Sequence, residues 1–284
     1  MGQGGRRWGA LAGAALLALL AAGCGGPMAQ GRRAMSRGDF EGAARAFAQA
    51  TEADPEDPRA WLALGRAHMA AERYPRARDA FTRVAHLRRH AALPRVLIGH
   101  TWELQRRYDE ALLAYRHAVE VAPESAYAHR VLGTRLVRWG RPEAAVEPLA
   151  RSVALDPAHA ETWNALGLAR YHAEDRAGAE RAFREGIARH PAHTGLRLGL
   201  AALLINAERF DEALAIYDAV VERVPTFAPA HVGRGILLHE LGREEEAEDA
   251  FVRAVEVARR PARFRRRLEA YRRLRRGSEP AADD

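Results

Sequence analysis

Residues 160–193, AETWNALGLARYHAEDRAGAERAFREGIARHPAH, contain the residue pattern from which the fold can be predicted. Trp163, Leu166 and Gly167 recur at helical spacing, so they share one face of a first helix. Small and aromatic residues recur at similar spacing in the second half, at Ala179, Phe183 and Gly186. Pro191 ends the second helix because proline cannot donate the next backbone hydrogen bond. This stretch therefore predicts two packed helices, with small residues where they approach and an aromatic ring beside them.

The same pattern returns every 34 residues. The small residue of the first helix recurs at Gly31, Gly65, Gly99, Gly133, Gly167, Ala201 and Gly235. An alanine follows it at Ala43, Ala77, Ala111, Ala145, Ala179, Ala213 and Ala247. A bulky apolar residue comes next, at Phe47, Phe81, Tyr115, Leu149, Phe183, Tyr217 and Phe251. The final proline stands at Pro55, Pro123, Pro157, Pro191 and Pro225, whereas Arg89 and Arg259 break that series.

A period of 34 residues with this pattern resembles the tetratricopeptide repeat (TPR) family. The resemblance implies an all-α fold, a right-handed superhelical solenoid of seven helix-turn-helix repeats followed by a C-terminal capping helix. The repeats are expected at 24–57, 58–91, 92–125, 126–159, 160–193, 194–227 and 228–261. Pro27 stands in the first repeat where Trp61 and Trp163 stand in later ones, so we expect its first helix to be short.

In the TPR family, the first helix of each repeat lines a groove that binds peptide segments. Carried onto this sequence, the resemblance gives six candidate contact residues: His100, Tyr127, Arg130, Asn164, Leu168 and Tyr171. We expect a protein or peptide segment to lie across repeats three to five, with the tyrosines stacking and Arg130 and Asn164 making polar contacts. The alternative for the aliphatic positions is packing against the neighbouring repeat.

The last repeat is followed by a strongly basic segment, ARFRRRLEAYRRLRR, at residues 262–276. Phe264, Leu268, Tyr271 and Leu274 form an apolar stripe, as expected for a helix that covers the last face of a repeat array. The segment has eight arginines and one acidic residue, Glu269. This charge belongs either to a solvated face or to a surface for anionic lipid or an acidic partner. Residues 277–284 are expected to form a disordered tail.

Arginine supplies all 44 basic residues of the chain, whose formal net charge is +7. Such uniform use of arginine indicates a GC-rich coding bias, and the repeats themselves are nearly neutral. We therefore do not expect nucleic acid as a partner.

The N-terminus carries the pattern of a secretory signal. Arg6 and Arg7 precede an apolar run of about 12 residues, shorter than the ~20 needed to cross a bilayer as a helix. The sequence that follows, Leu20-Ala21-Ala22-Gly23-Cys24, resembles the lipobox of bacterial lipoproteins, although that family prefers leucine where Ala21 stands. The resemblance implies removal of residues 1–23 and acylation of Cys24. The alternatives are an uncleaved membrane anchor and a buried core cysteine.

Residue patterns for catalysis, metal binding or cofactor binding are not recognisable. His190 and His193 form the one close histidine pair, without an HExxH pattern or a matching acidic ligand. No serine of the mature chain lies in a GxSxG elbow, and no glycine-rich phosphate loop follows a strand. Cys24 is the only cysteine, so disulfides and thiolate metal sites are excluded. We expect a protein that is not an enzyme and has no cofactor.

These observations predict a lipid-anchored TPR scaffold of the cell envelope, held at the outer membrane and facing the periplasm where the host has two membranes. TPR lipoproteins include pilotins, which help secretins of type IV pilus systems to assemble, and this resemblance concerns architecture alone. The alternatives are an adaptor for peptidoglycan or other envelope enzymes and a factor in outer-membrane protein assembly. The sequence does not determine the oligomeric state.

Overall fold

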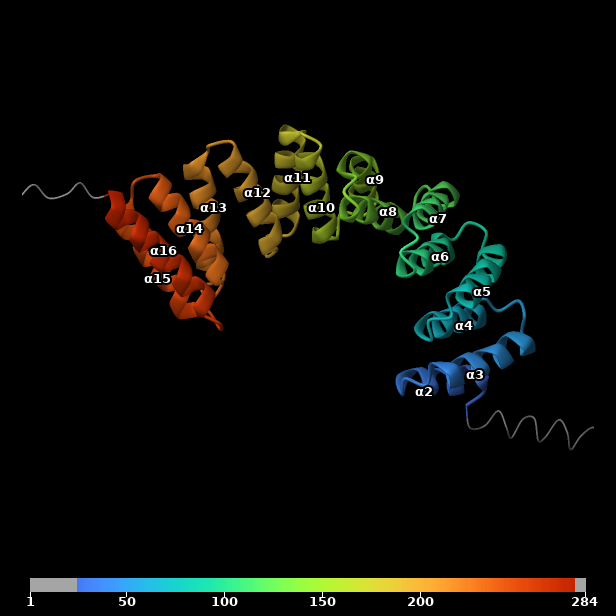
Figure 1. Ribbon diagram of the computed structural model, residues 1–284. Coiled ribbons are helices and arrows are strands. Elements are labelled where there is room, and N and C mark those ends of the chain that lie inside the picture. The colour runs from blue at the N-terminus through green and yellow to red at the C-terminus, as the bar shows by residue number, and fades with distance from the viewer. Residues whose placement is uncertain (1–24, 279–284) are drawn as a thin grey trace, which may run out of the picture. The chain divides into compact units, whose positions relative to one another are not determined.

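The computed structural model describes residues 25–278, so Cys24, the predicted signal sequence at residues 1–23 and residues 279–284 lie outside that range. Within it the chain forms fifteen α-helices and no strand, which confirms the all-α fold (Figure 1). The helices are α2 (Pro27–Ser36), α3 (Phe40–Ala53), α4 (Pro58–Ala70), α5 (Tyr74–Leu87), α6 (Ala92–Leu104), α7 (Tyr108–Val121), α8 (Ala126–Arg138), α9 (Pro142–Leu155), α10 (Ala160–His172), α11 (Arg176–Arg189), α12 (Thr194–Asn206), α13 (Phe210–Arg223), α14 (Ala228–Glu240), α15 (Glu244–Val257) and α16 (Ala262–Ser278).

The chain divides into two compact units, residues 1–132 and residues 133–284, and α8 contains the division. In the first unit, each helix from α2 to α7 packs on the next one along the chain. In the second unit, the same holds from α9 to α16, and α10 also contacts α12. Most contacts are therefore made between sequence neighbours, as in a linear repeat array.

The turn inside each helix pair has one recurring backbone geometry. Its second-last residue has a positive φ in every pair: Gly38, Glu72, Arg106, Gly140, Glu174, Glu208 and Gly242. The following N–H reaches back to the last turn of the first helix, for example from Asp175 to the carbonyl of Arg170 at 2.9 Å. This bond is the long hydrogen bond of a Schellman motif, which satisfies carbonyls that the helix end leaves open. Four of the seven positions hold a residue other than glycine, so their backbone is mildly strained.

The core of each pair is a contact between the recurring small residue and the ring or side chain sixteen residues later. A Cβ atom added to Gly65 would lie 2.7 Å from Cδ1 of Phe81, and one added to Gly99 would lie 2.6 Å from Cε1 of Tyr115. Phe81 and Tyr115 are almost fully buried. The glycine is therefore required by a close approach of a ring to helical backbone, as the sequence pattern predicts.

The turn between successive pairs is closed by a side-chain N–H that bonds to the backbone. Trp61 and Trp163 donate from Nε1 to the carbonyls of Pro55 and Pro157, at 2.8 and 3.0 Å. Chemically different side chains replace tryptophan in other repeats: His129 and His231 use Nε2 on the carbonyls of Pro123 and Pro225, and Arg197 uses Nη1 on that of Pro191. The shared requirement is an N–H donor rather than an indole ring.

The turn between α5 and α6 differs, because it lacks the proline whose carbonyl accepts this hydrogen bond in the other repeats. Arg89 stands where the other turns between repeats have proline, and there Arg95 donates instead to the carbonyl of Ala91, at 3.1 Å.

The sequence expectation of a short first helix is confirmed, since α2 has 10 residues and α4 has 13. One boundary needs correction: α16 continues to Ser278, so Gly277 and Ser278 are helical and not part of a disordered tail.

Candidate functional site

Three of the six predicted contact residues lie on one side of α10, in the second unit. Asn164, Leu168 and Tyr171 are half-buried, whereas Trp163 and Leu166 on the opposite side are buried. The side-chain amide of Asn206 on α12 donates to the hydroxyl of Tyr171 at 2.9 Å. This bond fixes the edge of the tyrosine ring against the next first helix.

The same side continues along the first helices of the second unit with aliphatic residues. We call this surface the open face and define it by Asn164, Leu168, Tyr171, Leu198, Ala202, Ile205, Val232 and Ile236. All eight side chains are half-buried or exposed, and none is charged. A largely aliphatic surface that is not covered by the chain's own described residues fits a protein partner better than it fits a small polar substrate.

The other three predicted residues lie in the first unit. His100 belongs to α6, and Tyr127 and Arg130 belong to α8. Tyr127 is 38% exposed, and the guanidinium carbon of Arg130 lies 5.6 Å from the centre of its ring, within cation–π distance. The structure therefore pairs Tyr127 with Arg130 and groups Asn164, Leu168 and Tyr171 separately. The predicted continuous groove through all six residues stays a prediction.

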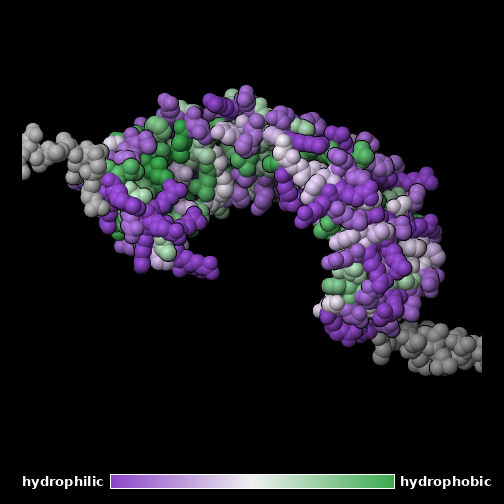
Figure 2. Space-filling model, in the orientation of Figure 1, coloured by the Kyte–Doolittle hydropathy of each residue, from purple (hydrophilic) through white to green (hydrophobic). Residues whose placement is uncertain are grey.

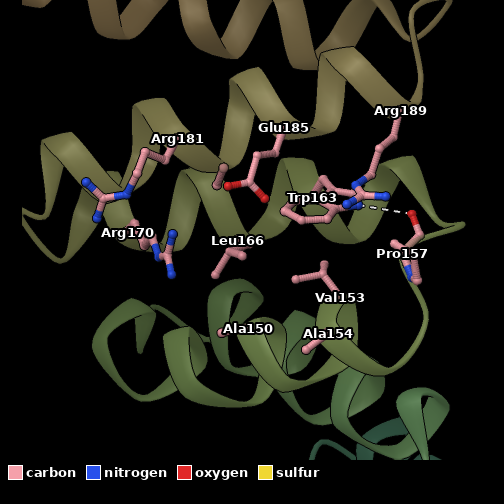
Figure 3. A pocket seen from close by; sticks show the side chains of 11 residues that line it. Ala150, Val153, Ala154, Pro157, Trp163, Leu166, Arg170, Arg181, Glu185 and Arg189 are labelled. Carbon is pink, nitrogen blue, oxygen red and sulfur yellow. Dashed lines mark hydrogen bonds between the residues drawn. The ribbon is translucent and has the colours of Figure 1, made fainter.

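A second surface feature of the second unit was not foreseen from the sequence. A hollow of about 420 Å³ lies among α9, α10 and α11 (Figure 3). Val153, Leu166 and Trp163 supply its apolar part, and Arg181, Glu185 and Arg189 supply polar groups. The 181, 185, 189 spacing places these three on one face of α11, a signal that was available in the sequence.

Several of the side chains that line this hollow already make contacts within the repeat. Trp163 uses its Nε1 on the Pro157 carbonyl, the dashed contact in Figure 3, and the Arg189 guanidinium lies 5.7 Å from the Trp163 ring. Arg170, also in the lining, donates to the carbonyl of Gly178 at 3.0 Å. The hollow offers room for an apolar side chain, but its chemistry is mixed in charge and selects no ligand class.

The basic C-terminal helix is attached through Tyr271. Its hydroxyl donates to Oε2 of Glu244 at 2.7 Å and lies 2.8 Å from the backbone carbonyl of the same residue, and its ring centre lies 4.8 Å from that of Phe251. Burial and the Glu244 carboxylate raise the pKa of Tyr271 to about 12, since both disfavour the phenolate. The Tyr271 hydrogen bond, followed by the one from His239, lowers the pKa of Glu244. Tyr271 is thus a neutral donor that ties α16 to α15.

The histidine pair singled out in the sequence has structural contacts. His190 donates from Nε2 to the Pro157 carbonyl at 2.9 Å, and Nδ1 of His193 accepts from the N–H of Leu196 at 3.2 Å. Across residues 25–278, no three His, Cys, Asp or Glu side chains are grouped so that they could hold a metal ion. In that same range, no helix combines the length and apolar character needed to cross a membrane.

Known protein families match most of the repeat region. Three models described as tetratricopeptide repeat match the chain: the first at residues 28–92, 105–160 and 131–194, the second at 170–231, and the third at 228–261. Among curated proteins, the human protein O-mannosyl-transferase TMTC3 is 26% identical over 166 residues. That match covers 58% of this chain and 16% of the relative, so the chain spans about a sixth of that protein's length.

Solved structures share the fold. The C-terminal part of a TPR repeat-containing protein from Cytophaga hutchinsonii matches with a TM-score of 0.67 and 12% identity, covering 83% of this chain and 97% of that one. Pseudomonas aeruginosa PilF matches with a TM-score of 0.56 and 16% identity, covering 75% of this chain and 96% of that one. At these identities the likeness shows the fold alone. The repeated helix pairs, the glycine–ring contacts and the family matches together show that the chain belongs to the tetratricopeptide repeat family.

Proposed function

We propose that this chain is a lipid-anchored TPR scaffold of the cell envelope that binds a protein client on its open face. TPR folds typically serve as non-catalytic scaffolds for protein–protein interaction, and the family membership supports that general role. The observation that carries the proposal is the open face itself, an uncharged, mostly aliphatic surface edged by Tyr171. Aromatic and aliphatic side chains surrounded by polar groups are the usual energetic centre of a protein interface.

Attachment to a membrane is supported by the lipobox-like sequence and by the position of the first helix. α2 begins at Pro27, so Gly25 and Gly26 alone separate Cys24 from helical structure. An extended chain spans at most ~3.3–3.6 Å per residue, so an acyl group on Cys24 holds α2 within about 10–15 Å of the bilayer surface. The client is therefore one that is handled close to the membrane.

More specifically, we propose that the chain is a pilotin-like factor that assists assembly of a type IV pilus secretin at the outer membrane. Its support is the combination of lipobox and regular repeats, with PilF as a neighbour in fold only. An adaptor for peptidoglycan or envelope enzymes, or a factor in outer-membrane protein assembly, would use the same surface and differ in its client.

The experiment is affinity capture from detergent-solubilised membranes of the source cells, with bound proteins identified by mass spectrometry. Wild type is expected to enrich a secretin, and the triple variant Tyr127→Ala, Arg130→Ala, Tyr171→Ala is expected to lose it. The matched control is Tyr108→Ala, Leu113→Ala, Arg116→Ala, three exposed positions on the second helix α7. Equal capture by wild type and the triple variant contradicts binding through Tyr171 of the open face and through the Tyr127–Arg130 pair. Enrichment of cell-wall enzymes instead of a secretin contradicts the pilotin assignment.

A further inference from the structure

The arginines around the start of α16 have no acidic partner among the residues that the structure describes. Within residues 25–275, whose side chains the structure describes, no carboxylate lies within ion-pair distance of five exposed arginines: Arg259, Arg260, Arg263, Arg266 and Arg267. Further along the same helix the situation differs, because Arg272 and Arg275 both contact the carboxylate of Glu248, at 2.8 and 3.0 Å. Glu248 therefore offsets part of the positive charge in the C-terminal half of α16, whereas no described carboxylate pairs with the arginines around its start.

Two hollows meet at these arginines. The first, about 650 Å³, is lined by Phe227, Val257 and Phe264 together with Arg259, Arg260 and Arg263, and no acidic residue lines it. The second, about 510 Å³, lies among α14, α15 and α16 and has an apolar part formed by Ile236, Phe251, Tyr271 and Leu274. Its polar lining consists of Arg266 and Arg267 together with His239 and one carboxylate, Glu240. Arg266 lines both. We call the second the cap-end hollow. Figure 2 shows the hydrophilic surface of α16 beside hydrophobic atoms over α13 and α14.

The cap-end hollow continues the open face. Ile236, the last aliphatic residue of that face, is 37% exposed, and Leu274 on the far side of the hollow is 66% exposed. The residues that define the open face are uncharged, and the arginines cluster around the start of α16, where Glu240 is the one carboxylate that lines the cap-end hollow. A segment lying along the face therefore meets apolar surface first and positive charge at this end.

We infer that the client segment is acidic as well as apolar, placing an apolar side chain in the cap-end hollow and its carboxylates on Arg263, Arg266 and Arg267. This inference rests on the proposed function, which supplies the client. Covering arginines with an uncharged segment would remove them from water without a partner, which is costly, whereas carboxylates give paired, charge-assisted hydrogen bonds. Concavity favours a peptide over an anionic membrane, because the apolar groups of Phe251 and Tyr271 lie inside the hollow and a flat bilayer does not reach them.

Fluorescence anisotropy with purified protein tests the inference. The probe is a short labelled peptide of alternating Asp, Glu, Leu and Phe. Its two controls replace either every acidic residue by Lys or every apolar residue by Ser, at about 0.15 M salt. The acidic, apolar probe is expected to bind at least about tenfold more tightly than either control.

Two protein variants locate the site. Arg266→Glu with Arg267→Glu is expected to weaken binding at least about tenfold, and Ile236→Ser with Leu274→Ser to weaken it severalfold. Arg176→Glu with Arg223→Glu makes the same change in net charge at exposed arginines of α11 and α13, outside the hollow, and is expected to bind like wild type. Thermal melts of all variants check that each one folds.

Three results would overturn the inference. Equal binding of the Ser-substituted probe shows charge attraction without use of the hollow. Equal weakening by the Arg176 and Arg223 variant shows dependence on net charge alone. Binding to phosphatidylglycerol vesicles, abolished by the Arg266 and Arg267 variant, together with failure to prefer the acidic, apolar probe, shows a membrane-binding patch. If the probe fails but membrane capture still depends on Tyr171, this inference is wrong and the proposed function stands.

Discussion

The ring of Phe183 lies directly against the backbone of Gly167, so close that a Cβ atom at Gly167 would be 2.5 Å from Cε1 of the ring. The two residues are on α10 and α11 and are sixteen residues apart. The same relationship recurs between Gly31 and Phe47, Gly65 and Phe81, Gly99 and Tyr115, Gly133 and Leu149, and Gly235 and Phe251. Stability of these six helix pairs therefore depends on a residue without a side chain, whereas the sixth repeat has Ala201 at this position.

Replacing Gly167 by leucine is expected to lower the free energy of unfolding by ~1–3 kcal/mol or more, because the core around Phe183 has no room for added atoms. Denaturant unfolding followed by circular dichroism measures the change. Ala177→Leu is the matched control, since Ala177 is exposed on α11. Equal losses in the two variants would show that Gly167 is not at a close contact.

Tyr271→Phe is expected to destabilise the attachment of α16 by about 1 kcal/mol, since it removes the hydroxyl bonds to Glu244 and keeps the ring. The folded pKa of Tyr271 is about 12, above the ordinary value near 10, so the folded chain keeps its proton over a range where the unfolded chain has lost it. This stabilising contribution is complete below pH 10 and is lost as the pH rises from about 10 to 12. Urea midpoints of both proteins at pH 8 and pH 11 should converge at the higher pH, and a constant difference would contradict the role of the hydroxyl.

His68 is expected to make the fold less stable in mild acid. Its Nδ1 is buried without a hydrogen-bond partner, and burial, then the nearby charges of Arg76 and Arg73, lower its pKa below the ordinary 6.5. Below pH 6.5, His68 binds a proton in the unfolded chain but stays neutral in the folded chain. The free energy of unfolding therefore falls as the pH falls toward the folded pKa. Melting temperatures of wild type and His68→Leu between pH 7.5 and 5 should show a smaller acid loss in the variant. His117→Gln, at an exposed position of α7, should retain the wild-type pH dependence.

Cys24→Ser is expected to release the protein from the membrane fraction, because serine does not accept the thioether-linked lipid of the lipoprotein family that residues 20–24 resemble. Membrane fractionation followed by intact-mass measurement checks both location and processing. A wild-type mass that retains residues 1–23 with an unmodified Cys24 would exclude acylation at this residue.

The helix pairs and their core could be predicted from the residue pattern alone. A helix pair is decided by contacts between residues at most about thirty positions apart, so the spacing of Gly167, Ala179 and Phe183 is enough to predict which faces meet. The apolar stripe of α16 followed from the same kind of local pattern. Residues 160–193 therefore contain most of the information for the fold of their own repeat.

Which polar and charged groups find a partner depends on how the helices pack and cannot be read from the repeat pattern. Nothing in the period shows that His129 and His231 take the place of tryptophan as donors to a turn carbonyl, because three different side chains supply the same N–H. Nor does composition show that Glu248 pairs with both Arg272 and Arg275, while no carboxylate among the described residues pairs with Arg266 or Arg267. Pairing depends on which carboxylate lies within about 4 Å of a long, rotatable side chain from another helix. The helical period predicts the side of the helix on which each residue lies, but not where the end of a long side chain lies. The hollows and the charged groups that line them could therefore be found only from the packed helices.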